Sequence, residues 1–220
     1  MGTHSALLRQ IEEVVIAYIL EQIRLIAEQV IQTTGYLGIA FLMFIENLFP
    51  PIPSEVVMPF AGFQVKQGEM SFTGVLLAGT LGALLGALAI YFFGYKLGEK
   101  RLRQWIGKYG KYVLLSEEEF DSSLTTFNDH GKKMVLFGRL IPTIRSLISI
   151  PAGVGKMNVP IFLLFTVMGT TVWNLLLAGG GVLLGRNWER VLSWVDTYSV
   201  VIYAILGLLL LYYVGSQVKR

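Results

Sequence analysis

The sequence of 220 residues has no cysteine, only two histidines and few charges, since charged residues make up 15% of it. Ordinary soluble domains carry about 25% charged residues. The lack of cysteine excludes disulfide frameworks, thiolate zinc sites and cysteine nucleophiles. With only His4 and His130 available, we expect no metal site, no cofactor and no catalytic triad. The small excess of 18 basic over 15 acidic residues does not suggest nucleic-acid binding.

Apolar residues are abundant instead, at 54% of the chain. Residues 73–95, 157–185 and 197–218 carry no charge at all. A helix needs about 20 apolar residues to cross the hydrocarbon layer, so these three stretches predict transmembrane helices. We therefore expect an all-α integral membrane protein with a single membrane domain over residues 1–220.

Two other apolar stretches, residues 35–67 and 132–156, are interrupted by proline. Proline removes a backbone N–H donor and ends or kinks a helix. The arms on either side are too short to cross a membrane, so both stretches predict re-entrant helical hairpins. Broken backbone at membrane depth must be covered by protein or line a water-filled cavity, which directs the hairpin tips into the interior. The proline breaks are Pro50, Pro51, Pro53, Pro142 and Pro151.

The remaining segments alternate apolar and charged residues at helical spacing, which is typical of interfacial helices. The expected order is an amphipathic helix (7–33), the first hairpin (35–67), a crossing (72–96), an amphipathic linker (99–131), the second hairpin (132–156) and two crossings (158–185 and 197–218). If the linker, the flanks of the second hairpin and the C-terminus share a side, that side holds 11 basic residues against three. This bias predicts a cytoplasmic linker and C-terminus. The side of the N-terminus stays open.

A shift of 91 residues aligns the chain with itself at several positions. Pro51 falls on Pro142, Ala61 on Ala152 and Gly62 on Gly153. Each half then has a surface helix, a broken hairpin and a crossing, so the second half is predicted to be inverted. Inverted repeats with broken helices that meet near the midplane are typical of transporters. We assign the glycines of the crossings to close helix packing, and Asn174 to a hydrogen bond between helices.

Four charges lie inside the two hairpins, namely Glu46, Glu55, Arg139 and Arg145. A charge at the bilayer centre costs about 2.5–3.5 kcal/mol on insertion scales, so such residues are usually functional or paired. The arginines present forked donors suited to a phosphate headgroup. The glutamates would exchange protons, although burial and arginine pairing act on their protonation in opposite directions. The alternatives are a structural ion pair that locks the hairpins together and a hairpin tip that rests at the membrane surface.

A family likeness rests on two signatures. The run GYLGIAFLMFIENLFPPIPSE at 35–55 resembles the first signature of the DedA family of bacterial membrane proteins. FGRLIPTIR at 137–145, followed by PAGVGKM at 151–157, resembles the second. The family shares the VTT domain with eukaryotic lipid scramblases and is understood as helical membrane proteins with two re-entrant hairpins. One departure is PPIPSE, where many members have a single proline before PGD or PGE.

The resemblance implies that Glu46 and Glu55 are the family's essential acids and Arg139 and Arg145 its essential arginines. It also implies a bacterial inner membrane and a substrate, undecaprenyl phosphate, the wall-polymer lipid carrier. The first hypothesis is therefore a flippase for this lipid, coupled to the proton gradient, with the isoprenoid tail left in the bilayer. The second is a proton-coupled transporter of ions or small polar solutes that supports membrane-potential and pH homeostasis. An enzyme is not expected, because no nucleophile lies at a suitable spacing from a base. Whether the chain forms a homo-oligomer stays open.

Overall fold

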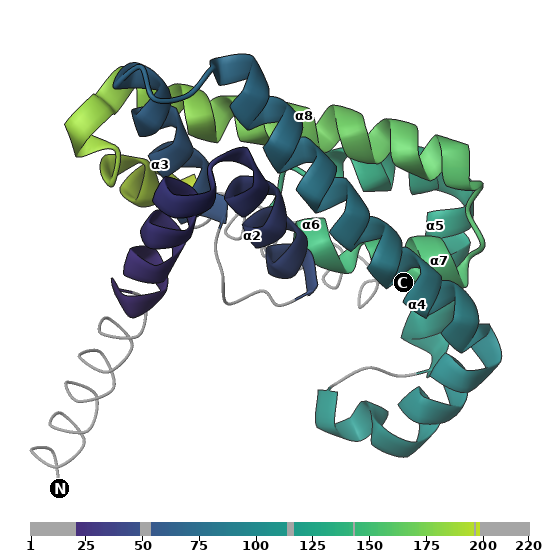
Figure 1. Cartoon of the computed structure of the whole chain (residues 1–220). Coiled ribbons are helices and arrows are strands. Elements are labelled where there is room, and N and C mark those ends of the chain that lie inside the picture. The colour runs from purple at the N-terminus through teal and green to yellow at the C-terminus, as the bar shows by residue number, and fades with distance from the viewer. Residues whose placement is uncertain (1–20, 49–53, 114–116, 143, 196, 199–220) are drawn as a thin grey trace, which may run out of the picture.

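The computed structural model describes residues 21–48, 54–113, 117–142, 144–195 and 197–198, and all regular elements among them are helical (Figure 1). The expected all-α class is confirmed for this part of the chain. A helical stretch over residues 21–34 comes first. The following elements are α2 (Tyr36–Leu48), α3 (Ser54–Lys66), α4 (Phe72–Val113), α5 (Glu117–Gly138), α6 (Ile144–Leu147), α7 (Ser149–Val154), α8 (Val159–Leu184) and the 3-10 turn η1 (Gly185–Asn187).

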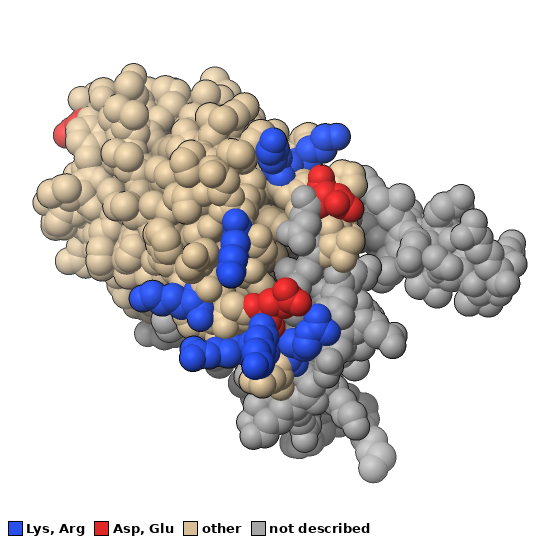
Figure 2. Space-filling view, turned by 90° about the vertical axis from the view of Figure 1, so that its right-hand side faces the viewer, with Lys and Arg blue, Asp and Glu red and all other residues tan. Residues whose placement is uncertain are grey.

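Two helices in the described residues are long and apolar enough to cross a membrane, Phe72–Gln104 and Val159–Asn187. The outward face of α4 supports this assignment. Leu77, Leu81 and Leu85 follow one another at four-residue spacing on α4 and are 59%, 55% and 58% exposed. Exposed apolar stripes of this kind face lipid or a partner. In the face shown in Figure 2, most charged side chains lie along the lower and right-hand borders, one acidic side chain lies at the far left edge, and the broad area between them carries none. The third predicted crossing lies outside the described residues beyond Tyr198.

A sharp kink divides α4. Gly98 has φ 67° and ψ 162°, so the backbone leaves the helical conformation at this residue. The positive φ is a conformation that glycine adopts without the steric cost of a Cβ. The apolar part of α4 ends there, and the charged residues Lys100, Arg101 and Arg103 follow. Gly98 thus separates the predicted crossing from the predicted linker, which comprises the rest of α4 and most of α5.

The two hairpin segments differ in their second arms. α2 and α3 form the arms of the first segment, and the breaks at Pro50, Pro51 and Pro53 lie outside the described residues. In the second segment the end of α5 leads through a turn at Pro142 into two short helices, α6 and α7. Pro151 lies in the first turn of α7 and has no N–H for the carbonyl group of Leu147, which explains why the two short helices do not join.

The hairpin segments and the long helices pack crosswise. α2 contacts α4 and α5 contacts α8, whereas α3 contacts α8 and α7 contacts α4. Gly62 and Gly153 make the last two contacts close: a Cβ on Gly62 would lie 2.1 Å from the carbonyl oxygen of Ala178, and one on Gly153 would lie 2.0 Å from that of Tyr91. Each long helix therefore packs most extensively against one arm of each hairpin segment.

The predicted hydrogen bond between helices at Asn174 is confirmed. Asn174 Nδ2 donates to Thr80 Oγ1 at 3.3 Å and so joins α8 to α4. Asn174 is fully buried at this contact. A polar bond between two apolar helices fixes their relative rotation and register, because any slip would leave the buried amide without its partner.

Candidate functional site

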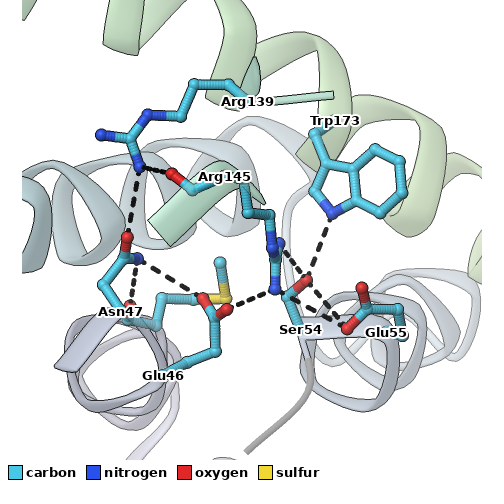
Figure 3. Close-up of polar contacts among 8 residues, drawn as sticks. Glu46, Asn47, Ser54, Glu55, Arg139, Arg145 and Trp173 are labelled. Carbon is cyan, nitrogen blue, oxygen red and sulfur yellow. Dashed lines mark hydrogen bonds and ion pairs between the residues drawn. The ribbon is translucent and has the colours of Figure 1, made fainter. Parts of the chain in front are cut away.

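The four charged residues of the hairpins lie together in the interior, where the two hairpin segments meet (Figure 3). Glu46 comes from α2, Glu55 from the first turn of α3, and Arg145 from α6, while Arg139 directly follows α5. Each of them is less than 9% exposed. The predicted site residues that carry charge are thus brought to one place from positions up to 99 residues apart in the chain.

Arg145 lies beside two carboxylates. Its Nη2 forms a close ion pair with Glu46 Oε1, and Glu55 Oε2 lies 3.7 Å from the same nitrogen. Its Nη1 donates to Ser54 Oγ. Charge-assisted bonds between a guanidinium group and carboxylates are among the stronger polar contacts in proteins. Arg145 therefore joins α2 and α3 of the first hairpin segment to α6 of the second.

Arg139 has neutral partners. Its Nη1 donates to Asn47 Oδ1 at 3.3 Å and to the carbonyl oxygen of Arg145, and its Nη2 donates to Ser149 Oγ at 2.8 Å. Among the described residues, no carboxylate lies within ion-pair distance of its guanidinium group. Asn47 links this arginine to the acids, because Asn47 Nδ2 lies 3.4 Å from Glu46 Oε2. Asn47 is therefore positioned between Glu46 and Arg139.

Trp173 of α8 forms one side of the cluster. Its Nε1 donates to Ser54 Oγ at 3.2 Å, and its ring lies 5.7 Å from the guanidinium carbon of Arg145. Phe162 has a similar place beside Arg139, at 5.9 Å from that guanidinium carbon. Aromatic faces attract cations at such distances, most strongly where water is excluded. The two arginines are thus held between polar acceptors on one side and aromatic rings of α8 on the other.

The cluster is closed. A cavity of only about 10 Å³ remains among its residues, with Glu46, Asn47, Arg139, Arg145 and Trp173 in its lining. This volume suffices for a single water molecule at most. The Nε atoms of both arginines are buried without a hydrogen-bond partner among the described residues. The cluster therefore has unused donors but no space for a ligand in this arrangement.

Sequence reasoning found the four charges but missed the uncharged members of the cluster, namely Asn47, Ser54 and Ser149. A usable signal existed, because each is a polar residue in an otherwise apolar arm, and the first two directly adjoin a glutamate. Trp173 was not predicted as a member of the site either, yet its indole N–H donates to Ser54 Oγ within the cluster. No three His, Cys, Asp or Glu side chains of the described residues come together as metal ligands.

Comparison with known proteins gives one family match. The model of the VTT domain matches residues 52–183 of the chain. A protein of Lactococcus lactis subsp. cremoris (strain MG1363), named alkaline phosphatase-like protein, is 45% identical over 182 residues, which are 82% of this chain and 85% of that protein.

Two relatives carry the name undecaprenyl phosphate transporter A. The protein of Bacillus subtilis (strain 168) is 35% identical over 185 residues, which are 83% of this chain and 89% of that protein. The protein of Staphylococcus aureus (strain NCTC 8325 / PS 47) is 31% identical over 200 residues, which are 87% of this chain and 97% of that protein. No solved structure matches the chain.

Proposed function

The chain belongs to the VTT-domain family, the DedA family of membrane proteins, and on this premise we propose that it moves undecaprenyl phosphate across the bacterial inner membrane with coupling to the proton gradient. This is a family of transporters and not of enzymes. The observation that carries the proposal is the buried cluster of two arginines and two glutamates between the hairpin segments.

The charge balance of the cluster supports proton coupling. With all four groups ionised, its net charge is zero. A phosphate monoester brings about 1.5 to 2 negative charges at neutral pH. An unbalanced charge is costly away from water. Uptake of protons by Glu46 and Glu55 would restore neutrality when the phosphate arrives, and release of these protons would accompany its departure. The proposed cycle therefore moves protons and lipid phosphate in the same direction.

The contacts of Arg145 support competition between carboxylates and phosphate. Glu46 and Glu55 occupy the donors that the oxygens of a phosphate would need. Protonation of Glu46 would weaken its pair with Arg145 and release Nη2 for the ligand. Protonation of Glu46 would also change its contact with Asn47. Since Asn47 contacts both Glu46 and Arg139, this change would affect the hydrogen bond that Arg139 donates to Asn47. Arg139, whose partners are neutral, would be the first charge that the phosphate meets.

The crosswise contacts of the hairpin segments support an inverted repeat. If α2–α4 and α5–α8 are equivalent halves, each half gives one hairpin arm to the long helix of the other. Since the cluster has no space for a headgroup, the halves must part on one side at a time to admit it, as in alternating access. The closed arrangement is then the unloaded state between the two openings. The linker over residues 99–131 and the C-terminus are taken as cytoplasmic.

The test uses the full chain in liposomes with a fluorescent undecaprenyl phosphate and an imposed pH gradient. We expect headgroup flipping that follows the gradient, loss of flipping in Arg139→Gln, and flipping independent of the gradient in Glu46→Gln. A fluorescent phospholipid, which has acyl chains in place of the isoprenoid chain, serves as the control cargo. Flipping by the wild type at equal rates with and without a gradient would refute the coupling.

A second measurement addresses the alternative function. Vesicles without any polyprenyl phosphate are loaded with a panel of ions and small polar solutes, and proton flux is followed with a pH dye. We expect no flux that depends on these solutes. A solute that drives proton movement through the wild type but not through Arg139→Gln would replace the lipid as the cargo.

A further inference from the structure

An apolar groove of about 520 Å³ lies on the surface between α8 and four later residues, Val191, Trp194, Val195 and Tyr198. Its volume is in the usual range for small-molecule sites, about 300–1,000 Å³. Leucines and valines dominate its lining, together with three aromatic residues, Trp173, Trp194 and Tyr198. The polar atoms of two of these, Tyr198 and Trp173, already have hydrogen-bond partners. Tyr198 Oη donates to the carbonyl oxygen of Leu140 at 3.1 Å, and Trp173 Nε1 donates to Ser54 Oγ at 3.2 Å. The groove is therefore suited to a hydrocarbon chain.

The groove adjoins the charged cluster. Trp173 lines both the groove and the small cavity of the cluster. Leu140, another lining residue of the groove, directly follows Arg139 in the chain. A single indole thus separates an apolar site from the guanidinium group of Arg145, 5.7 Å from its ring. A ligand with a charged head and an apolar tail would fit the two sites together.

The depth of the groove depends on glycine. Gly179 lines it, and a Cβ at this position would meet no atom within 4 Å. At the neighbouring Gly180, a Cβ would lie 3.0 Å from Val191. The rim is formed by leucines that point outward, since Leu176 is 59% exposed and Leu183 is 77% exposed. The groove is accordingly open toward the side that faces the bilayer.

We propose that this groove binds the first isoprene units of the substrate lipid while its phosphate lies in the charged cluster, with Trp173 at the boundary between them. The inference rests on the proposed function and makes it more specific: the tail near the headgroup is bound by the protein, whereas the sequence suggested a tail left in the bilayer. Two other occupants are outcomes of the test, namely residues 199–220 of the same chain and ordinary acyl chains.

The experiment measures binding of two radiolabelled probes to the full chain in lipid nanodiscs, farnesyl phosphate with three isoprene units and dimethylallyl phosphate with one. Gly179→Leu fills the groove where the structure has free space. We expect it to weaken farnesyl phosphate binding about tenfold or more, because the displaced chain loses its apolar burial. Binding of dimethylallyl phosphate should change less than about twofold. Gly179→Ala should give an intermediate loss for the longer probe.

Two controls separate the possible failures. Ala89→Leu enlarges a small exposed residue on the outer face of α4 and should leave both probes unaffected. Arg139→Gln should weaken both probes, because both carry the phosphate. Unchanged farnesyl phosphate binding in Gly179→Leu, together with loss in Arg139→Gln, would overturn binding of the isoprene units in the groove and leave the proposed function intact; this is the outcome expected if residues 199–220 or ordinary acyl chains occupy the groove. Equal loss of both probes in Gly179→Leu counts against the groove as well. Unchanged binding in Arg139→Gln would overturn the proposed function itself.

Discussion

Arg139 and Arg145 lie six residues apart in one hairpin segment and are both buried, yet the groups around them differ in kind. Arg145 contacts two carboxylates of the other hairpin segment. Arg139 is held by an amide oxygen, a serine hydroxyl and a carbonyl oxygen. We therefore expect Arg145 to contribute more to the stability of the closed fold, and Arg139, whose partners are neutral, to keep its charge available for a ligand. On the proposed function, Arg139 is the first to bind the phosphate, whereas Arg145 joins the hairpin segments until protonation of Glu46 releases its Nη2 for the ligand.

The largest effect is expected for Arg145→Met. The change leaves Glu46 and Glu55 buried without their cation, and loss of one partner of a buried pair costs about 3–5 kcal/mol. Thermal unfolding of the purified protein in detergent would measure the loss at neutral pH. The double variant Arg145→Met with Glu46→Gln is the control, and it should recover part of the stability because the neutral amide does not need a cation. A single variant as stable as the wild type would show that Arg145 does not lock the hairpins.

A smaller loss of stability, but a large loss of phosphate binding, is expected for Arg139→Gln. Removal of the guanidinium group leaves Asn47 and Ser149 without a donor, which costs about 1–3 kcal/mol. No ionised partner in direct contact is left behind. Unfolding and farnesyl phosphate binding are measured on the same preparation. The distinction between the two arginines fails if Arg139→Gln unfolds as readily as Arg145→Met.

Trp173→Phe is expected to have a still smaller effect on stability. Phenylalanine retains an aromatic face toward Arg145 but cannot donate to Ser54 Oγ, so about 1 kcal/mol should be lost. Trp173→Leu removes the aromatic face as well and should lose more, since cation–π contacts in dry surroundings contribute about 2 kcal/mol. The two variants are compared by unfolding in detergent. Equal losses would mean that the ring face does not hold Arg145.

The site could be predicted in part because charge is conspicuous in an apolar chain. Glu46, Glu55, Arg139 and Arg145 contradict the composition around them, and their cost in a membrane requires a reason. Burial of an uncharged polar group costs much less than burial of a charge, so Asn47 and Ser149 gave a weaker signal and were not recognised. Which arginine faces the acids was also beyond the sequence, because it depends on how α6 packs against the first hairpin segment.

For the fold, too, the sequence predicted local features but not how distant segments pack together. Apolar length predicted the helices of α4 and α8, since it depends only on local composition. The crosswise packing of the hairpin segments depends on backbone approaches at Gly62 and Gly153, where a Cβ would meet a carbonyl oxygen of a long helix. The alignment of the two glycines under the 91-residue shift indicated that they are equivalent. It did not indicate that each would contact the helix of the opposite half.

The smallest effect is expected at a third arginine, which provides the surface counterpart of Arg145. Arg24 forms ion pairs with Glu21, Glu28 and Glu189 at 2.5, 2.7 and 2.9 Å, and so joins the helical residues 21–34 to the region after η1. Although it has more carboxylate partners than Arg145, its side chain is 22% exposed. Exposed pairs contribute about 0–1 kcal/mol and are screened by salt.

Salt is a better variable than pH for this prediction. A hydrogen bond from Arg24 lowers the pKa of Glu21, so its contribution is present above the ordinary glutamate pKa and is lost as the pH falls. Burial raises the pKa of Glu28, so protonation of that group acts in the opposite direction. As the pH falls through the acidic range, protonation of Glu21 lowers the stability of the fold and protonation of Glu28 raises it, so the two effects oppose each other. Arg24→Ala should therefore differ from the wild type by less than about 1 kcal/mol at low salt and not at all near 1 M salt, whereas the loss in Arg145→Met should persist there. A salt-sensitive loss in Arg145→Met would mean that its carboxylates are reached by solvent, and the contrast between the buried and the surface arginine would disappear.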